Sequence, residues 1–157
     1  MKEKNEVDMK VAIYGAGAMG TVLGAYIAKA GVDIDLINRN EKHVAALKEK
    51  GAHIIGTVDF SQKVNALLPS EMSEKYDIIL LMTKQRYNGE IVAFLKDYLK
   101  EDGALCTCQN GLPEFKIAEM IGAERTLGCA IAWGATFHGE GVSELTSAPD
   151  ALTFSLG

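Results

Sequence analysis

The feature that most constrains the fold is a G-x-G-x-x-G pattern close to the start of the chain, formed by Gly15, Ala16, Gly17, Ala18, Met19 and Gly20. A short apolar run rich in β formers precedes it at residues 11–14, and small apolar residues at helical spacing follow it at 21–30. Gly31 ends the predicted helix, and residues 32–37 are typical of a second strand. In the order strand, glycine turn, helix and strand, the pattern predicts a dinucleotide-binding site.

Each glycine has a physical reason in this interpretation. Gly15 allows a sharp turn off the strand, Gly17 lets a pyrophosphate approach the backbone, and Gly20 lets the helix pack closely on the strand. The N-terminus of the helix then presents free N–H groups and a partial positive charge to the phosphates. The alternative is a tight strand-to-helix turn that binds nothing.

Length and charge narrow the classes of partner. The chain has 157 residues, enough for one domain with a real core, and its net charge of -5 argues against nucleic acid. It has no apolar run long enough to span a bilayer, so no membrane partner is expected. Residues 1–10 are charged, lack the apolar centre of a signal peptide, and are expected to form a solvated tail.

The three cysteines, Cys106, Cys108 and Cys129, have no disulfide-framework spacing, which favours a cytoplasmic location. Cys106 and Cys108 alternate within a predicted strand, so they share a face and are poorly placed for a disulfide. A metal site would need further ligands nearby, and the sequence shows none. We therefore expect small core-filling residues.

The pattern of elements predicts an α/β fold of the Rossmann type, with a doubly wound, mostly parallel sheet. Residues 52–56 and 58–64 are interpreted as a small β excursion at the edge of that sheet, and the last β-prone pieces as an antiparallel extension of it. The further strands are expected at 76–82 and 104–108, the helices at 41–50, 87–99 and 114–121, and the last β-prone pieces at 125–137, 142–146 and 152–156.

Ligands of such folds bind beyond the carboxyl ends of the strands. At the end of the second strand, Asn38 stands where NAD-binding proteins usually carry an acid, and Arg39 follows it. An arginine can bind a 2′-phosphate through paired N–H donors, so this pair favours NADP over NAD. The alternative for Arg39 is an exposed residue on a turn. Asp35 is a competing acid, but it lies several residues too early.

Two more strand ends carry polar residues. Lys84 is placed to contact a cofactor or a substrate, or is simply a surface cation. Asn110-Gly111 is either a turn dipeptide or a means of placing an amide beside a nicotinamide. Trp133 is expected in the core, and His53 and His138 are expected to be exposed.

Together these groups resemble the N-terminal domain of the ketopantoate reductase family (2-dehydropantoate 2-reductases), over nearly the whole chain. The resemblance rests on the GAGAMG run, Arg39, Thr83-Lys84, Gln109-Asn110-Gly111-Leu112 and Gly134-Ala135-Thr136. It implies that residues 15–20 hold the pyrophosphate of the cofactor. It also implies that Asn38 and Arg39 bind the end of the cofactor that carries the 2′-phosphate, and that Thr83 and Lys84 contact the cofactor. It further implies that Asn110 lies between nicotinamide ribose and substrate, and that Ala135 makes a backbone contact to NADP(H). Trp133 departs from the smaller or more polar residue of many relatives, which bears on substrate preference.

Members of that family are about twice as long, and a helical second domain supplies the general-acid lysine and most of the substrate pocket. The resemblance therefore implies that residues 1–157 are an NADP-binding half, inactive alone, of an enzyme that reduces the 2-keto acid ketopantoate to pantoate for coenzyme A synthesis. A related reductase of another 2-keto or 3-hydroxy acid, or a non-catalytic nucleotide-sensing module, remains an alternative. The oligomeric state stays open: apolar surface left without its second domain tends to associate, so a possible homodimer of this chain would be an artefact of that exposed surface.

Overall fold

The structure is a computed structural model that describes residues 8–157, so most of the expected N-terminal tail lies outside the described residues. Its main sheet has seven strands in the order β11-β8-β7-β6-β1-β2-β5. Their bounds are β1 (Lys10–Tyr14), β2 (Asp33–Ile37), β5 (Asn65–Leu67), β6 (Tyr76–Leu81), β7 (Leu99–Thr107), β8 (Thr126–Ile131) and β11 (Phe154–Leu156). All neighbours in this sheet run parallel except β11, which is antiparallel to β8.

A second sheet of four strands has the order β4-β3-β10-β9. It consists of β3 (Ala52–Gly56), β4 (Phe60–Gln62), β9 (Ala135–Phe137) and β10 (Val142–Leu145). The α-helices of the described chain are α1 (Ala18–Lys29), α2 (Glu41–Lys50), α3 (Asn88–Leu95) and α4 (Glu114–Ile121).

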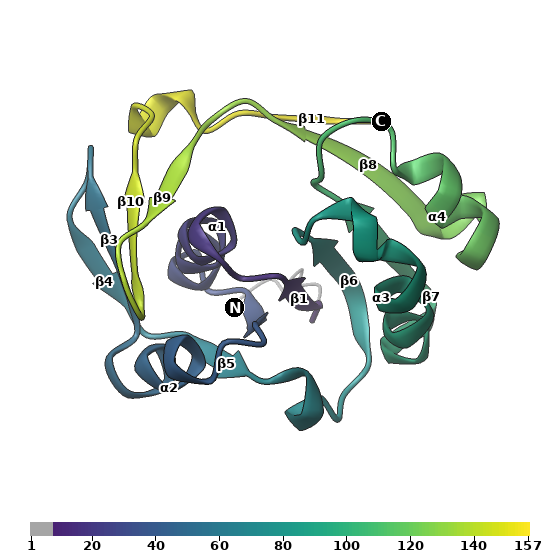
Figure 1. Ribbon diagram of the computed structural model, residues 1–157, viewed down its shortest axis with the longest axis horizontal. Coiled ribbons are helices and arrows are strands. Elements are labelled where there is room, and N and C mark those ends of the chain that lie inside the picture. The colour runs from purple at the N-terminus through teal and green to yellow at the C-terminus, as the bar shows by residue number, and fades with distance from the viewer. Residues whose placement is uncertain (1–7) are drawn as a thin grey trace, which may run out of the picture.

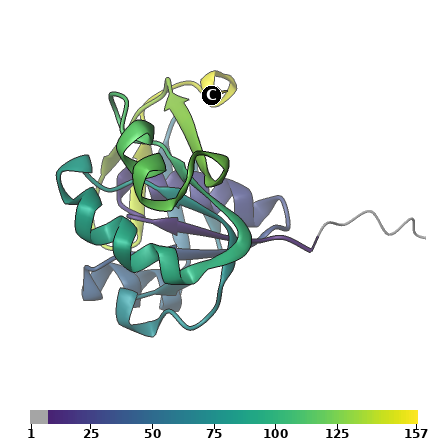
Figure 2. The same ribbon diagram turned by 90° about the vertical axis from the view of Figure 1, so that its right-hand side faces the viewer.

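Helix α1 lies between the two sheets, and α3 and α4 cover the opposite face of the main sheet (Figures 1 and 2). One core cluster joins Val22 and Ala25 of α1 to Leu36 of β2 and Leu145 of β10. A second cluster packs α3 and α4 onto the side chains of β1, β6 and β7 that point the other way. Alternate residues of β1 therefore enter different clusters, as expected for a strand buried on both faces.

The local sequence accounts for the start of α2. The side chain of Asn40 accepts a hydrogen bond from the backbone N–H of His43 at 3.1 Å, and Gly51 ends the helix with φ 75°. An N-terminal cap and a C-terminal glycine are the usual signals of helix ends. The predicted bounds 41–50 and 114–121 are confirmed.

The fold class is confirmed, and two expectations about its β pieces are wrong. Residues 52–56 do not border the main sheet; β3 pairs with β10, 86 or more residues later in the sequence, and β5 (Asn65–Leu67) borders β2 instead. The antiparallel extension is confirmed only for β11. β8 runs parallel to β7, because α4 provides the crossover, and β9 and β10 lie in the second sheet. Local propensity predicts that a segment is a strand, but it does not identify its partner.

The cysteines are free, Cys106 and Cys129 are buried as expected for core residues, and the parallel register of β7 and β8 brings all three together. Cys106 pairs with Leu127, and Thr107 pairs with Gly128, so the next pair of positions brings Cys129 beside Cys108. Cys129, which is distant from Cys106 and Cys108 in the sequence, therefore lies close to both in space.

The described helices are short. The longest of them, α1, has 12 residues. None of the helices within residues 8–157 is both long enough and apolar enough to cross a bilayer.

Candidate functional site

The site is the carboxyl edge of the four central strands, and backbone hydrogen bonds hold these strand ends together. The N–H of Gly15, after β1, donates to the carbonyl of Ile37 in β2 at 2.9 Å. The N–H of Met82, after β6, donates to Tyr14 at 2.9 Å, and that of Cys108, after β7, donates to Leu81 at 2.9 Å. The strands that follow β1 are added first on its β2 side and then on its β6 side, so the strand order reverses between β1 and β6. Ligands of such folds bind at this switch point.

The glycine loop combines one enforced turn with one open position. Gly15 has φ 97°, and a Cβ there would lie 2.8 Å from Cγ2 of Thr83. Gly17 is the N-terminal cap of α1; no side chain caps it, and a Cβ there would meet nothing within 4 Å. The first N–H groups of α1 therefore face open space beside a backbone that a phosphate can approach.

A buried histidine holds this loop from behind. The Nδ1 of His43 accepts the N–H of Gly141 at 3.0 Å, so Nε2 carries the ring proton and donates to the carbonyl of Ala16 at 2.9 Å. The hydroxyl of Thr21 donates to the same carbonyl at 3.2 Å. Burial lowers the pKa of His43, which favours the neutral ring. His43 was not anticipated from the sequence, because its partners are distant along the chain.

Two cavities flank the loop. One, of about 610 Å³, extends from the loop to the ends of β7 and β8, and the other, of about 510 Å³, extends to the end of β2. Both are lined by Gly15, Gly17, Met82, Thr83 and Lys84. Together they form a cleft across the glycine loop. We name them the β7-side cavity and the β2-side cavity.

The β2-side cavity is positively charged. Its lining includes Asn38, Arg39, Lys84 and Arg86, and none of the described lining residues is Asp or Glu. The guanidinium carbon atoms of Arg39 and Arg86 lie 6.0 and 4.7 Å from the ring centre of Tyr87. In the described part of the chain, no ion pair involves these cations. They are therefore available to an anion.

Arg86 and Tyr87 were not among the residues expected at the site. They follow β6 in a short 3₁₀ turn (Gln85–Tyr87), in a stretch whose sequence pattern indicated only the loop and helix beyond the strand. The turn directs Arg86 toward the same cavity as Arg39, although the two residues come from different strand ends. A second arginine a few residues after the Thr83-Lys84 pair was the available signal.

The β7-side cavity is lined by Ala18, Met19 and Gly20 of the loop and helix, and by Gln109 and Asn110 after β7. The amide nitrogen of Gln109 donates to the carbonyl of Thr83 at 2.6 Å and to Oδ1 of Asn88 at 2.8 Å. Gln109 therefore links the ends of β6 and β7 to the start of α3. Asn110 is exposed, and among the described hydrogen bonds it provides only its backbone carbonyl, to Nε2 of Gln85 at 2.5 Å. Its side-chain amide is available to a ligand.

Trp133 belongs both to the core and to the site. It is 6% exposed and packs in the cluster around α1, yet it also lines the β7-side cavity. Its buried Nε1–H has no hydrogen-bond partner in the described structure. The expectation that Trp133 lies in the core is confirmed, and its second position in the cavity wall was not anticipated.

Two expected site residues, Ala16 and Ala135, line neither of the two described cavities. Ala16 is fully buried and provides its backbone to Ile37 and His43 instead of lining either cavity. Ala135 begins β9 and lines neither described cavity, so its cofactor contact stays a prediction.

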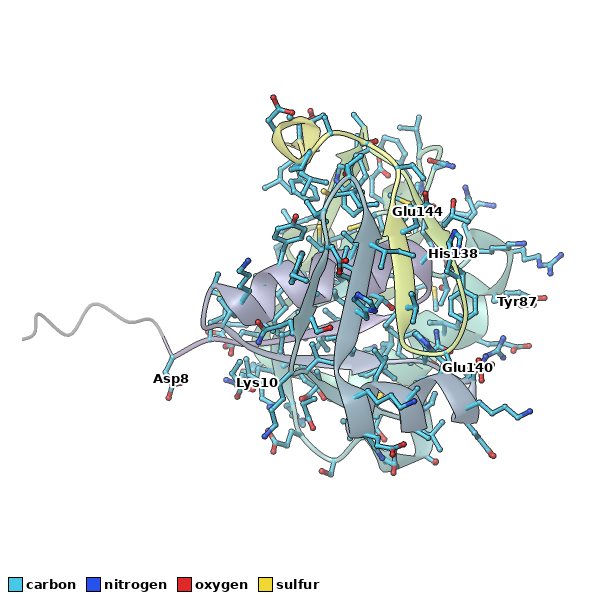
Figure 3. All side chains as sticks on the ribbon, turned by 90° about the vertical axis from the view of Figure 1, so that its left-hand side faces the viewer. Asp8, Lys10, Tyr87, His138, Glu140 and Glu144 are labelled. Atoms are coloured by element: carbon cyan, nitrogen blue, oxygen red, sulfur yellow. The ribbon has the colours of Figure 1, made fainter. Side chains whose placement is uncertain are left out.

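Asp35 and the exposed histidines are accounted for by other contacts. Asp35 is 2% exposed and accepts a hydrogen bond from the Tyr76 hydroxyl at 2.6 Å, which makes it a structural residue. His53 pairs with Asp59, and His138 pairs with Glu144 on the outer sheet (Figure 3).

Comparison with protein families gives one match. The family described as "Ketopantoate reductase PanE/ApbA" matches residues 11–156. Among curated proteins, a 2-dehydropantoate 2-reductase of Pyrococcus abyssi is 37% identical over 139 residues, which is 88% of this chain and 45% of the relative. A 2-dehydropantoate 2-reductase of Streptococcus pyogenes is 33% identical over 87% of this chain and 45% of its own length. The chain thus spans about half the length of the curated relatives it matches.

Solved structures agree on the fold. A 2-dehydropantoate 2-reductase from Geobacter metallireducens superposes with a TM-score of 0.84 and 26% identity, over 95% of this chain and 49% of that one. A D-mandelate dehydrogenase, in its ternary structure with NADH and anilino(oxo)acetate, superposes with a TM-score of 0.81 and 27% identity, over 94% of this chain and 47% of that one.

Proposed function

Because this chain belongs to the ketopantoate reductase PanE/ApbA family, we propose that it binds NADP(H) as the cofactor-binding half of a 2-dehydropantoate 2-reductase. The named relatives at 37% and 33% identity support the reaction, the reduction of the 2-keto acid ketopantoate to pantoate toward coenzyme A. The cleft across the glycine loop supports the class of cofactor, because a dinucleotide needs room on both sides of its pyrophosphate.

The observation that carries the choice of NADP over NAD is the acid-free β2-side cavity with its two arginines. A carboxylate at the end of β2 would accept a hydrogen bond from a ribose 2′-hydroxyl and repel a 2′-phosphate. Asn38 carries no negative charge that would repel this phosphate, and the guanidinium groups of Arg39 and Arg86 provide paired donors of the geometry that phosphate accepts. Tyr87, near both arginines in the lining of this cavity, offers an aromatic ring to an adenine.

In this proposal the nicotinamide end lies in the β7-side cavity, where a bound NADPH would supply the hydride. The free amide of Asn110 orients the ribose and the substrate carboxylate or hydroxyl, and Lys84 provides a cation to the cofactor at the common wall of the two cavities. Gln109 acts through other residues, because its hydrogen bonds fix the backbone of Thr83.

Reduction of a ketone also needs a proton donor for the developing alkoxide. Lys84 is the only lysine among the described residues that line either cavity, and it lies at the glycine loop that would hold the phosphates. We therefore propose that the general acid lies in the part of the relatives' length that this chain does not span. The isolated 157 residues should bind NADPH without turning over ketopantoate.

Titration of the chain with NADPH, followed by nicotinamide fluorescence or calorimetry, tests the site. Gly17→Leu places a side chain where the structure has open space, so the protein should fold and lose at least about tenfold in affinity. Gly89→Leu, an equally open glycine that lines neither cavity, is the matched control and should bind as the wild type does. Equal affinity of the Gly17 and Gly89 variants would contradict the binding site. Steady reduction of ketopantoate by the isolated chain would contradict the proposal that the general acid lies outside these 157 residues.

One structural neighbour supports a second candidate class of substrate. The D-mandelate dehydrogenase superposes nearly as well as the Geobacter reductase does, and the anilino(oxo)acetate in its structure carries a carbonyl group next to its carboxylate, as a 2-keto acid does. A panel of 2-keto acids, assayed with the full-length enzyme and NADPH, separates the two. Faster reduction of an aromatic 2-keto acid than of ketopantoate would favour the neighbour's chemistry.

A further inference from the structure

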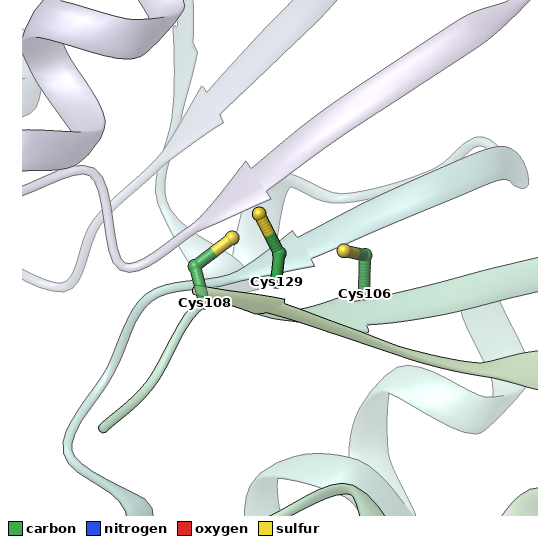
Figure 4. A group of neighbouring side chains, drawn as sticks. All are labelled: Cys106, Cys108 and Cys129. Atoms are coloured by element: carbon green, nitrogen blue, oxygen red, sulfur yellow. The ribbon is translucent and has the colours of Figure 1, made fainter. Parts of the chain in front are cut away.

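The three cysteines of the chain gather at the carboxyl end of β7 and β8. Their Sγ atoms all lie within 4.8 Å of one another, and none is in a disulfide. Cys106 lies in β7, Cys108 just beyond it, and Cys129 in β8; all three sulfur atoms project from the same side of these strands (Figure 4). The chain contains no other cysteine. Cys106 and Cys129 are buried and Cys108 is half-buried, so all the thiols of the chain meet at one point beneath the surface.

The spacing is close to that of a thiolate metal site. Zinc–sulfur bonds of about 2.3 Å in tetrahedral geometry place sulfur atoms about 3.8 Å apart. Contraction from 4.8 Å to that spacing needs movements of about 1 Å shared among three side chains, within reach of small side-chain rotations. The backbone positions are already fixed by the β7–β8 ladder and by the Cys108 N–H, which donates to Leu81 at 2.9 Å.

The cluster is also reachable from solvent. A cavity of about 280 Å³ is lined by Cys108, Cys129 and the residues around them, and Cys108 lines the β7-side cavity as well. An ion could therefore enter, and a water molecule could occupy a coordination position on the open side.

We propose that Cys106, Cys108 and Cys129 form a three-thiolate site for a thiophilic d¹⁰ cation of the Zn²⁺ and Cd²⁺ class, with solvent as the fourth ligand. Three sulfur ligands select soft cations over Mg²⁺ or Ca²⁺. Each thiol releases its proton to solvent as the sulfur–metal bond forms, and no electron is transferred. The site stands on its own geometry and does not depend on which nucleotide the chain binds.

Hydrogen bonding from Cys108, with a smaller contribution from Cys129, lowers the pKa of Cys106 despite its burial. The same interaction raises the pKa of Cys108, and burial raises that of Cys129. A cation that binds the three sulfur atoms would displace the protons that they carry.

Cadmium titration of the reduced, metal-free chain tests the site through the ultraviolet sulfur-to-metal charge-transfer absorption. The wild type should saturate at one Cd²⁺ per chain. The single substitutions Cys106→Ser, Cys108→Ser and Cys129→Ser should each weaken Cd²⁺ binding by more than about 100-fold. Loss of a residue that only hydrogen-bonds to a metal ligand costs up to about 100-fold, so loss of a ligand should cost more. His53→Asn and His138→Asn remove exposed imidazoles elsewhere and should leave the titration unchanged.

A second measurement on the wild type covers the case in which a serine variant fails to fold. One equivalent of Cd²⁺ should slow the reaction of all three thiols with a chromogenic disulfide by at least about tenfold. Absence of saturation at one equivalent, wild-type affinity in a folded serine variant, or protection of only one thiol would each overturn the proposal.

Discussion

The ring of His43 and the carbonyl of Ala16 are joined by a 2.9 Å hydrogen bond that fixes the back of the glycine loop. On its other side, the same ring accepts the N–H of Gly141 at 3.0 Å, in the turn between β9 and β10. One neutral imidazole therefore connects the loop, α2 and the second sheet. Protonation would place a donor against the N–H of Gly141 and break that connection.

This relationship predicts a pH dependence of stability. The pKa of His43 is lowered in the folded state by burial, so below about pH 6.5 the unfolded chain binds the proton more readily. Stability should be full above about pH 6.5 and fall as the pH drops from there toward the folded pKa. Urea unfolding between about pH 7.5 and 5.5 measures it.

The matched variants for that experiment are His43→Leu and His53→Asn. At neutral pH, His43→Leu should be less stable by about 1–3 kcal/mol, because it leaves the Gly141 N–H and the Ala16 carbonyl without the ring. It should also show a flatter pH dependence, whereas His53→Asn, at an exposed histidine, should keep the wild-type slope. If the stability of the wild type and of His43→Leu fell equally with pH, His43 would not be the group responsible for the pH dependence.

Gly15→Ala should destabilise the fold by more than about 2 kcal/mol, since it combines a left-handed backbone with a close contact. The added Cβ would lie 2.8 Å from both Cγ2 and the backbone nitrogen of Thr83, and φ at Gly15 is 97°. Gly89→Ala, in α3 with open space around it, should instead gain about 0.5–1 kcal/mol. Chemical denaturation compares the two, and a Gly15 variant as stable as the wild type would contradict the tight turn at the end of β1.

Tyr76→Phe should cost about 1–3 kcal/mol, because it removes the hydroxyl that donates to the buried carboxylate of Asp35 at 2.6 Å. Tyr98→Phe is the matched control: its ring packs on Phe94, and no described hydrogen bond uses its hydroxyl. The same unfolding experiment serves both. Similar losses of unfolding free energy in the two variants would show that the Tyr76–Asp35 hydrogen bond contributes little to stability.

Many residues that line the two cavities could be predicted from the sequence, because they directly follow predicted strands. The glycines, Arg39, Thr83, Lys84 and Asn110 each come shortly after a strand end, and parallel strands bring such ends to one edge. Arg86 and Tyr87 are exceptions, because only the 3₁₀ turn after Lys84 directs them to the same cavity, and Trp133 is a third.

The missed features depend on pairing between distant segments. β3 and β10 are joined into a second sheet by contacts that no local pattern encodes, and His43 meets Gly141 only because of that sheet. The cysteine cluster likewise needs the parallel register of β7 and β8. Periodicity and turn residues report local conformation, whereas register between remote strands is decided by packing.

The central claim is that the β2-side cavity recognises a 2′-phosphate. Arg39→Ala and Arg86→Ala should each weaken NADPH binding by about tenfold or more, the value of a hydrogen bond to a charged group, and leave NADH nearly unaffected. Lys42→Ala, an exposed cation on α2 that lines neither cavity, controls for loss of a general positive charge and should alter neither nucleotide.

The most direct test is the ratio of the NADH and NADPH dissociation constants, measured by calorimetry on the wild type and on Arg39→Ala. We predict that the wild type binds NADPH at least about tenfold more tightly than NADH and that the ratio approaches one in the variant. Equal affinity of the wild type for both nucleotides, or a parallel loss of both in the variant, would contradict the account.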